Sequence, residues 1–481
     1  MRTFKPQVSL AGRKTFSLGI ADSIRASIVR GQLRPGELLP STRELAAELR
    51  VHRHTVLAAL EILVSEGRLE AHARRGFSVS QRAQFERSPP TRAAPSFAGF
   101  RIVRDGARVD APPVSAIPYP LHSATPDPTL APHAELKAAY AHVLRRPRRE
   151  LFEIADERGH PPFIRVLGDH VRQNRGLVAR ELMVTHGSQE AIALVARALV
   201  APGDVVAVEE PGYPPAWDAF RAAGARLAAV RVDAQGLDVE ALTRLAKRRR
   251  VRLLYTTPAH HFPTSVTLSP ERRGELLTIT ARHGIPILED DYDHEYQYVG
   301  LPVAPLAADS SFGHVIYAGT LSKLIGSGVR LGFVVAAPEL LQVLARLCRI
   351  GTRGHDPVAQ AALAAWMGDG GLERHLRRAR RAYVARREAL LAAFAEAVSD
   401  GSLALQVPNG GLGLWARFRG CDSMKLALAA QQRGITVLPE QSLRLREATC
   451  DGARLSFSRC PPDELLAAGA ELLQIARELR R

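Results

Sequence analysis

The chain begins with three stretches in which apolar residues recur at a helical period. The stretches are residues 16–30, 42–49 and 52–66. Each places apolar side chains three or four positions apart, which predicts an amphipathic helix. Ser41 stands immediately before the second stretch and Glu44 follows three residues later, a capping-box pattern that predicts the start of that helix. Two short alternating runs, residues 68–71 and 76–79, then predict a pair of strands.

Beyond this region the periodicity disappears and then returns as an alternation of strands and helices. Residues 81–118 are rich in Pro, Ala, Arg and Ser and have no apolar period, so we predict a linker stiffened by its prolines. Over residues 119–481, short apolar runs alternate with helical patterns, which predicts an α/β domain. We therefore expect a front domain (residues 1–80) tethered to a larger rear domain (residues 119–481).

The front domain has the pattern of a winged helix-turn-helix, because three helices are followed by a short basic hairpin. In that fold the start of the third helix enters the major groove of DNA. The candidate base-contacting residues are His52, Arg53, His54 and Thr55. Ser41 and Arg43 are expected at phosphates. At the wing tip, Arg74 and Arg75, next to Gly76, suit the minor groove or flanking phosphates. A solvated helical hairpin would carry similar residues, so these residues alone leave both interpretations open.

Charge favours the DNA-binding interpretation. Residues 1–90 hold 15 basic and 8 acidic side chains, hence +7 of the chain's net +16, which leaves +9 for the other 391 residues. Positive charge is therefore about three times denser in the front domain, as expected for a surface that binds double-stranded DNA.

Composition excludes several other classes of protein. Hydrophobic residues make up 46% of the chain and charged residues 24%, as in ordinary globular proteins. No apolar run approaches the roughly 18 residues of a membrane helix, and the N-terminus lacks the apolar segment of a signal peptide. We therefore expect a cytoplasmic protein with no membrane partner. None of the four cysteines forms a CxxC pair, which argues against a zinc knuckle and a disulfide framework.

One lysine of the rear domain stands out, because the chain has only 6 lysines among its 65 basic residues. Lys323 follows a predicted buried strand at residues 315–318. A desolvated lysine loses its proton readily and can form a Schiff base with a carbonyl. Thr320, Ser322 and Arg330 lie close by in the sequence and would suit a phosphate group. The stretch indicates a phosphorylated aldehyde, with a solvated loop lysine as the alternative.

A second predicted strand, residues 286–293, ends in acidic residues. Since side chains alternate along a strand, Asp290 and Tyr292 share one face. A carboxylate beside a phenol suits a pyridine ring, because the carboxylate holds the ring nitrogen protonated and the phenol donates to the adjacent oxygen. Metal binding is the alternative, with Glu289, Asp290, Asp291 and Asp293 as ligands. No His or Cys at ligand spacing supports it, so we expect no metal site.

Two further strand ends carry candidate ligand groups. Gly187, Ser188 and Gln189 open an apolar helix directly after a strand, an arrangement that binds phosphate through backbone N–H groups. Tyr213 follows another strand, where its ring could stack on a flat cofactor or simply fill a turn.

These motifs resemble two known families in their order and spacing. Residues 28–70 resemble the GntR-type winged-helix domain, with G-x-L-x-P-G-x-x-L-P-S-x-R-x-L-A followed by V-x-R-x-T-V. The rear domain carries THGSQEA, PGYPP, TPAHHFPT, LEDDYD and GTLSK with RLGF, and resembles the fold type I aminotransferases. The combination looks most like the MocR family of regulators. This resemblance implies a mostly parallel central sheet, a smaller C-terminal α+β subdomain from about residue 350, and a homodimer.

The resemblance also implies pyridoxal 5'-phosphate (PLP) as the cofactor. PLP would be bound to Lys323, with Asp290 on the ring nitrogen, Tyr292 near the ring oxygen and Tyr213 stacked on the ring. The implied phosphate ligands are Gly187, Ser188, Gln189, Thr320, Ser322 and Arg330. Arg454 matches the arginine that binds the substrate carboxylate in aminotransferases, and here it would bind the carboxylate of an effector.

The chain departs from both family patterns at several positions. His52 and His54 replace the usual Ser and Asn, which could alter the base preference or make it pH-sensitive. In the rear domain, Ser265 replaces the glycine of a P-T-G turn, Ser327 belongs to a pair that is usually bulkier, and Ala131 replaces a Phe.

We predict a PLP-dependent, DNA-binding transcription regulator that senses PLP or an amino compound. The chief alternative is an active aminotransferase whose DNA-binding arm regulates only its own expression. A third hypothesis, that the rear domain merely dimerises the arms, conflicts with the intact set of Lys323, Asp290, Tyr292 and Arg330.

Overall fold

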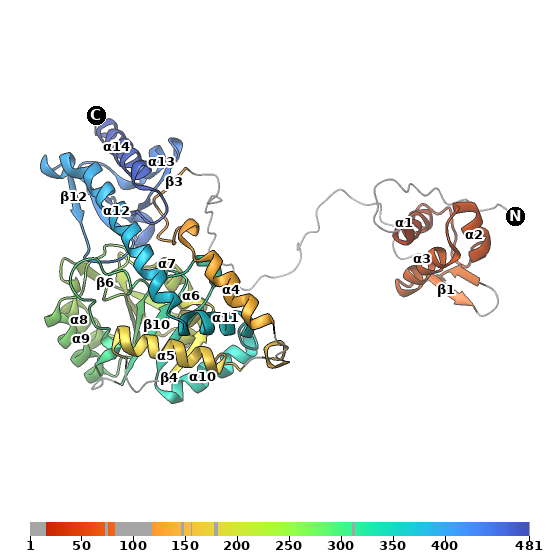
Figure 1. The fold of residues 1–481 in the computed structure, drawn as a ribbon, viewed down its shortest axis with the longest axis horizontal. Coiled ribbons are helices and arrows are strands. Elements are labelled where there is room, and N and C mark those ends of the chain that lie inside the picture. The colour runs from red at the N-terminus through yellow and green to blue at the C-terminus, as the bar shows by residue number, and fades with distance from the viewer. Residues whose placement is uncertain are drawn as a thin grey trace. The chain divides into compact units, whose positions relative to one another are not determined.

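The computed structural model describes residues 16–72, 76–81, 118–145, 149–154, 156–177, 181–309 and 313–480. The chain divides into two compact units, residues 1–103 and 104–481 (Figure 1). Nearly all of the predicted linker lies outside the described residues, and so do the wing-tip residues Arg74 and Arg75.

The first unit has three helices and a two-stranded hairpin. The helices are α1 (Phe16–Val29), α2 (Thr42–Leu49) and α3 (Arg53–Ser65), and β1 (Leu69–His72) pairs antiparallel with β2 (Gly76–Val79). The predicted capping box of α2 is confirmed, because Ser41 Oγ accepts from the Glu44 N–H and the Glu44 carboxylate accepts from the Ser41 N–H. The core side chains without exposed surface include Ile20, Ile24, Leu45, Val56, Leu60 and Leu63. The predicted winged helix-turn-helix is therefore present.

An eight-stranded sheet forms the centre of the second unit. Its strands are β4 (Glu181–Thr185), β5 (Val205–Glu210), β6 (Arg226–Asp233), β7 (Gly236–Leu237), β8 (Val251–Thr256), β9 (Ile287–Asp291), β10 (Val315–Thr320) and β11 (Gly332–Ala336). The order across the sheet is β4-β11-β10-β9-β8-β5-β6-β7. Strands β10, β9, β8, β5 and β6 run parallel, whereas β11 is antiparallel to both of its neighbours, β10 and β4. The sheet is thus mostly parallel, as the α/β alternation predicted.

Helices cover both faces of this sheet, in a three-layer arrangement (Figure 1). One apolar cluster joins the sheet to α6 (Gly187–Leu199), α7 (Pro214–Ala222) and α10 (Pro338–Gly351). The other cluster includes residues of α4 (His133–Leu144), α5 (Pro161–Arg175), α8 (Val239–Arg248), α9 (Pro270–His283) and α11 (Pro357–Gly368). Adjacent residues of one strand belong to opposite clusters: Leu288 packs in the first and Ile287 in the second. Burial of both faces explains why these strands are continuously apolar.

The C-terminal part forms a smaller α+β subdomain behind the long helix α12 (Gly371–Ser399). Its four-stranded antiparallel sheet has the order β12 (Leu403–Gln406), β13 (Gly413–Phe418), β16 (Gly452–Ser456) and β15 (Leu438–Pro439). The helices α13 (Ser423–Gln432) and α14 (Pro462–Leu479) complete it. The short strand β3 (Tyr119–Pro120) pairs in parallel with β14 (Ile435–Thr436), so the beginning of the rear domain is joined to its end.

The parallel strands end at one edge of the central sheet, and the candidate site residues follow those ends. Tyr213 comes after β5, Thr257 after β8, Asp290 lies near the end of β9, and Lys323 comes after β10. In open α/β sheets this carboxyl edge is where ligands bind.

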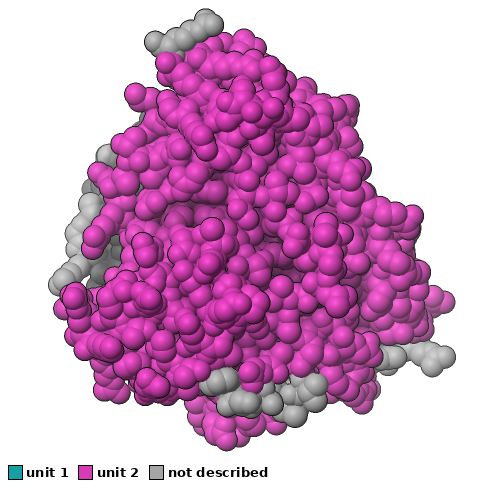
Figure 2. Space-filling view, turned by 90° about the vertical axis from the view of Figure 1, so that its left-hand side faces the viewer, with its two compact units in different colours: residues 1–103 teal, residues 104–481 magenta. Residues whose placement is uncertain are grey.

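Among the described helices, none combines the length and apolar character required to cross a membrane. Figure 2 shows one face of the second unit, residues 104–481, in magenta.

Candidate functional site

Lys323 lies in the turn between β10 and β11, and its amine faces a cavity. The Nζ atom donates a hydrogen bond to the carbonyl oxygen of Ala124 over 3.1 Å. Burial of the amine, followed by the nearby positive charge of Arg454, lowers the pKa of Lys323 to about 8. A lysine with such a pKa has a substantial neutral fraction near neutral pH, and a neutral amine is the nucleophile that attacks an aldehyde.

Asp290 faces the same cavity from β9. Its Oδ2 atom accepts a hydrogen bond from the hydroxyl of Tyr255 over 2.8 Å, while its buried Oδ1 has no partner among the described groups. Burial raises the pKa of Asp290 to about 7, an effect that the Tyr255 hydrogen bond partly offsets. A buried carboxylate oxygen without a donor is costly, and a positively charged ring N–H would satisfy it.

The neighbouring acids of β9 point elsewhere. Glu289 accepts from the backbone N–H groups of Leu306 and Ala307, and Asp291 pairs with His294 at 2.8 Å. The alternation along the strand therefore separates Asp290 from both, and the acids do not converge as ligands for one metal ion.

Two tyrosines complete the wall around Lys323 and Asp290. The Tyr213 ring meets Phe262 edge-on with centroids 5.2 Å apart, and the Tyr292 hydroxyl donates to the carbonyl oxygen of His260 over 3.0 Å. The cavity opens to solvent, and the empty space within it and at its mouth together amounts to about 400 Å³. The lining residues are Ala124, Ser188, Tyr213, Tyr255, Thr257, Phe262, Asp290, Tyr292 and Lys323.

The candidate phosphate ligands come together at the start of α6. Gly187 begins this helix with φ +79°, and its backbone lies so close to Gly332 that a Cβ on Gly332 would come within 2.7 Å of the Gly187 Cα. Arg330 Nη2 donates to the carbonyl oxygen of His186 over 3.0 Å, which holds the guanidinium beside Gly187. The N-cap residue His186 makes no side-chain capping bond, so the helix start is available to an anion.

The other candidate phosphate ligands differ in whether their side chains already form hydrogen bonds within the protein. Ser188 lines the cavity, and the buried Ser322 Oγ has no partner among the described groups. The Thr320 hydroxyl, in contrast, donates to the Leu331 carbonyl and accepts from the Ser322 N–H, and Gln189 Nε2 donates to the Pro215 carbonyl. Thr320 therefore also shapes the turn that presents Lys323.

Arg454, on β16, is fully buried at the edge of the site. Its Nη1 donates to the Pro263 carbonyl over 2.9 Å and to Ser265 Oγ over 3.3 Å, and its guanidinium lies 4.9 Å from the Phe262 ring centroid. Its Nε is buried without a partner among the described groups. Ser265 has φ +60°, a left-handed conformation that glycine adopts more easily, which explains the glycine of the family pattern. In this chain the Ser265 hydroxyl accepts a hydrogen bond from Arg454.

Sequence reasoning missed Tyr255, Thr257, Phe262 and Ala124 as wall residues. Tyr255 lies in β8, beside β9, and only the register of the two strands shows that its hydroxyl reaches Asp290. The position of Thr257 just past the end of β8 was a usable signal, because polar residues at that edge line ligand sites.

The candidate DNA-contacting side chains are exposed on the first unit. Arg43, His52, Arg53 and His54 are exposed, and Arg53 Nε donates to Thr42 Oγ1 over 3.1 Å. His52 is the N-cap of α3 rather than its first residue, and its ring stacks on that of His54 with centroids 5.4 Å apart. Ser41 and Gly76 are exposed and Thr55 is half-buried.

A winged helix and an α/β domain with a half-buried lysine at its carboxyl edge are the features of a PLP-type regulator. The family model "Aminotransferase class I and II" matches residues 127–468, and "Bacterial regulatory proteins, gntR family" matches residues 16–79. The chain belongs to the MocR family of PLP-dependent, GntR-type transcription regulators.

Individual relatives support this assignment. The chain is 32% identical to the probable rhizopine catabolism regulatory protein MocR of Rhizobium meliloti, over 92% of this chain and 90% of that protein. It is 31% identical to the transcriptional regulator TauR of Rhodobacter capsulatus, over 89% of each chain. A Pyrococcus horikoshii kynurenine aminotransferase, solved in complex with PMP, superposes with a TM-score of 0.72 at 26% identity, covering 76% of this chain and 92% of that one.

The residues of the cavity fit PLP, the cofactor of this class of fold. The partnerless Asp290 Oδ1 matches a protonated ring nitrogen, the Lys323 amine matches the aldehyde carbon, and the α6 start with Arg330 matches a phosphate.

Proposed function

We propose that PLP binding around Lys323, alone or with an amino compound, changes the affinity of the front domain for its DNA operator. One observation supports this most directly. An amine with a pKa of about 8 shares a cavity with a buried carboxylate oxygen that lacks a donor, in a chain that also carries a GntR-type winged helix.

Each cavity residue has a proposed role. Lys323 Nζ is the atom that forms the covalent bond to the cofactor, and Asp290 holds the ring nitrogen protonated. Tyr213 packs against the ring and Tyr292 lies near its oxygen. When bound, PLP supplies a conjugated ring that withdraws electrons from an attached amino compound.

The proposed phosphate ligands share the carboxyl edge of the sheet with Lys323. They are the α6 start at Gly187, Ser188 and Gln189, together with Thr320, Ser322 and Arg330. The helix N-terminus contributes partial positive charge and Arg330 a full one, so both favour a dianionic group.

Arg454 is the proposed contact for an effector carboxylate. It carries a buried positive charge whose Nε has no partner, on the same side of the cavity as Phe262. The same arrangement would serve an amino acid substrate, and this observation keeps an active aminotransferase as the second candidate function.

We propose a homodimer as the assembled form. Large apolar side chains are exposed close together in the sequence at Tyr140, Leu144, Phe152 and Ile154, with exposed fractions of 37%, 53%, 74% and 75%. Such a concentration favours burial against a second copy. Light scattering of the full chain tests this by giving twice the 52.4 kDa mass of one chain.

We propose that the winged helix contacts DNA bases and DNA phosphates with different residues. Because these contacts require access to chromosomal DNA, we also propose a cytoplasmic location. The proposed base contacts are His52, Arg53, His54 and Thr55, and the proposed phosphate contacts are Ser41 and Arg43. For the wing residues Arg74, Arg75 and Gly76 we propose contacts with the minor groove or with flanking phosphates.

The decisive experiment measures operator affinity with and without PLP at one fixed salt concentration. The operator is the fragment that the full-length protein selects from a random DNA library. Linkage requires that PLP and DNA alter each other's affinity by the same factor, and coupling of this kind is typically about 5- to 150-fold. Lys323→Ala should lose this response while retaining DNA binding.

The rival function gives a different result. Rapid multiple-turnover transamination of an ordinary amino acid, with operator affinity indifferent to PLP and to that amino acid, would establish the enzyme. Arg454→Gln then distinguishes the signals: it abolishes the response to a carboxylate effector, whereas a response to PLP alone persists and only moves to higher pH.

A further inference from the structure

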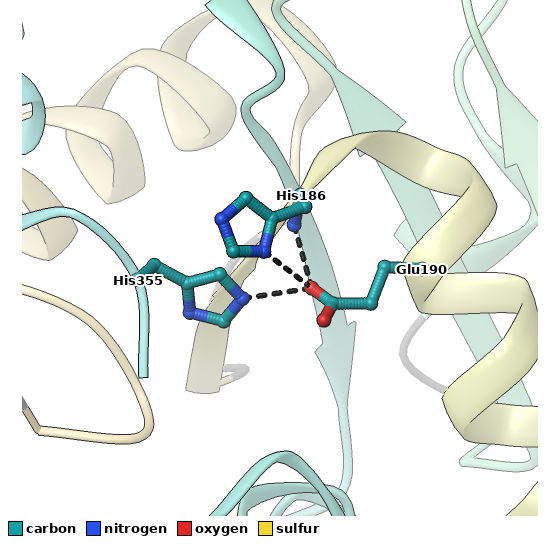
Figure 3. A group of neighbouring side chains, drawn as sticks. All are labelled: His186, Glu190 and His355. Atoms are coloured by element: carbon teal, nitrogen blue, oxygen red, sulfur yellow. Dashed lines mark hydrogen bonds and ion pairs between the residues drawn. The ribbon is translucent and has the colours of Figure 1, made fainter. Parts of the chain in front are cut away.

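A second group of ionisable side chains lies beside the start of α6 and has no role in the proposed function. His186 precedes α6, Glu190 lies one turn into this helix, and His355 lies just before α11. Figure 3 shows both imidazole rings directed at the Glu190 carboxylate. Their three ligand atoms lie within 4.8 Å of one another, and no other group of three or more His, Cys, Asp or Glu in the described ranges meets this condition.

The two distances from the Glu190 carboxylate to the histidines are close to those of a metal site. Glu190 Oε2 lies 2.7 Å from His355 Nε2 and 3.5 Å from His186 Nδ1. Two atoms that bind one tetrahedral zinc ion at about 2.0–2.1 Å lie roughly 3.4 Å from each other. The His186 contact already matches this spacing, and the His355 contact must open by less than about 1 Å.

The three residues come from two parts of the chain, the start of α6 and the segment before α11. The His355 side chain is fully buried, and its exposed fraction of 0% contrasts with 17% for Glu190 and 40% for His186. The Glu190 carboxylate is fixed further because Oε2 accepts the His186 backbone N–H over 2.6 Å. Burial therefore holds the His355 side chain and a hydrogen bond holds the Glu190 side chain, and the exposed His186 side leaves room for water as a fourth ligand.

The donor set indicates which ion fits. Two imidazole nitrogens with one carboxylate oxygen suit divalent transition metals such as Zn²⁺, whereas Mg²⁺ and Ca²⁺ prefer oxygen donors throughout. Three protein ligands plus one water is the usual composition of an open zinc site.

We propose that His186, Glu190 and His355 bind one divalent transition-metal ion, with Zn²⁺ as the best match. His186 also links this site to the cofactor region, because its carbonyl oxygen accepts from Arg330 Nη2 over 3.0 Å. The competing explanation is a hydrogen-bonded tie between α6 and the segment before α11, with no affinity for metal.

The test uses the full-length, tag-free protein loaded with PLP and freed of metal by dialysis against a chelator. Calorimetric titration with Zn²⁺ should give one ion per chain. Titration with Co²⁺ should give the intense visible absorption of a four-coordinate ion. Zn²⁺ itself gives no such signal, because its d shell is full. His186→Asn, Glu190→Gln and His355→Gln should each lose this binding and this absorption.

The controls separate metal binding from a change of fold. His283→Gln removes an exposed histidine on α9 and should bind Zn²⁺ like the wild type. Tryptophan fluorescence identifies any cluster variant that fails to fold, and the remaining variants then carry the comparison. The proposal is overturned if the wild type binds no stoichiometric Zn²⁺, or if the folded cluster variants bind it unchanged. Because the readout is metal binding, either result is independent of the regulator function.

Discussion

The hydroxyl of Tyr255 donates a hydrogen bond to Asp290 Oδ2 over 2.8 Å, from one parallel strand to the next. This contact leaves the buried Oδ1 as the atom that faces the cavity without a donor. Burial keeps the pKa of Tyr255 well above its usual range, so the phenol stays neutral and remains a donor. The pair therefore fixes the orientation of the carboxylate before any ligand enters.

Replacing Tyr255 by Phe should weaken PLP binding. The Tyr255 hydrogen bond lowers the pKa of Asp290, which burial has raised to about 7, so its loss raises that pKa further. At pH 7 more of the carboxyl is then protonated and unable to pair with a cationic ring nitrogen. A hydrogen bond to a charged group contributes about 1.5–3 kcal/mol, which corresponds to a loss of affinity of roughly 10- to 100-fold.

Absorbance titration with PLP across pH 6.5–8.5 measures this effect, which should be smaller at the alkaline end. Tyr119→Phe, in β3 beside β14 and outside the cavity lining, is the control and should behave like the wild type. Equal affinities for Tyr255→Phe and wild type at pH 7 would contradict the role of the pair.

The rate at which PLP becomes covalently attached should rise with pH through about 8. Burial first, and Arg454 second, lower the pKa of Lys323 to about 8, and only the neutral amine attacks the aldehyde. Arg454→Gln removes a positive charge, so the pKa of Lys323 rises and the profile moves to higher pH. Borohydride trapping and peptide mapping measure attachment, with Lys323→Ala as the control without trapped cofactor. Trapping at a different lysine would overturn the site, and an unmoved profile in Arg454→Gln would refute the electrostatic coupling.

Two arginines of the front domain should affect DNA binding differently. Arg53, at the start of α3, is placed for a base edge, so Arg53→Ala should cost about 1–3 kcal/mol at the operator. Arg43, at the start of α2, is placed for a phosphate. Arg43→Ala should therefore lower the affinity for all DNA sequences alike. It should also reduce the slope of log affinity against log salt concentration by about one phosphate contact. Fluorescence anisotropy with operator and scrambled DNA at several salt concentrations separates the two. The placement of α3 in the major groove is wrong if Arg53→Ala binds the operator with wild-type affinity.

A buried ion pair behind the site should dominate the stability of the rear domain. Arg175 Nη2 lies 2.5 Å from Glu295 Oε1, and both side chains are almost completely buried. Arg175→Met leaves the Glu295 carboxylate with His170 as its remaining partner, and removal of one member of such a pair typically costs about 3–5 kcal/mol. Arg172→Met removes an exposed pair with Asp169 on the same helix and should cost less than about 1 kcal/mol.

The pH dependence of this pair has a definite sign. Burial raises the pKa of Glu295, but Arg175 together with His170 and His294 outweighs burial and holds this pKa well below its usual range. The stability from Glu295 is therefore fully present above its unfolded pKa of about 4.3 and is lost as the pH falls through the folded value. Without Arg175 the pKa of Glu295 moves upward, so the variant loses less stability than the wild type on acidification. The difference between wild type and Arg175→Met should thus be smaller at pH 5 than at pH 7.

Urea denaturation followed by tryptophan fluorescence measures these differences, because all three tryptophans (Trp217, Trp366 and Trp415) lie in the rear domain. A cost below about 1 kcal/mol for Arg175→Met at pH 7, equal to that of the exposed control, would show that the pair contributes little.

The elements that the sequence predicted are those set by neighbours along the chain. Ser41 and Glu44 specify the start of α2 because each satisfies a backbone group three residues away. The alternation along β9 separates Asp290 from Glu289 and Asp291 because the pleat itself imposes a period of two. Continuous apolar runs predicted the buried strands, since a sheet covered on both faces has no polar side.

The tertiary structure decided every relationship between residues that are distant in the sequence. Tyr255 and Asp290 are 35 positions apart, and Glu190 and His355 are 165 apart, so no local pattern encodes either contact. Arg454 meets Ser265 across 189 positions, and the left-handed backbone of Ser265 is visible only in the folded turn. Such contacts depend on strand register and on how helices pack over the sheet, which are set by the burial of the whole core. Local sequence therefore determined the elements and their chemistry, and only the packed core determined which polar groups meet.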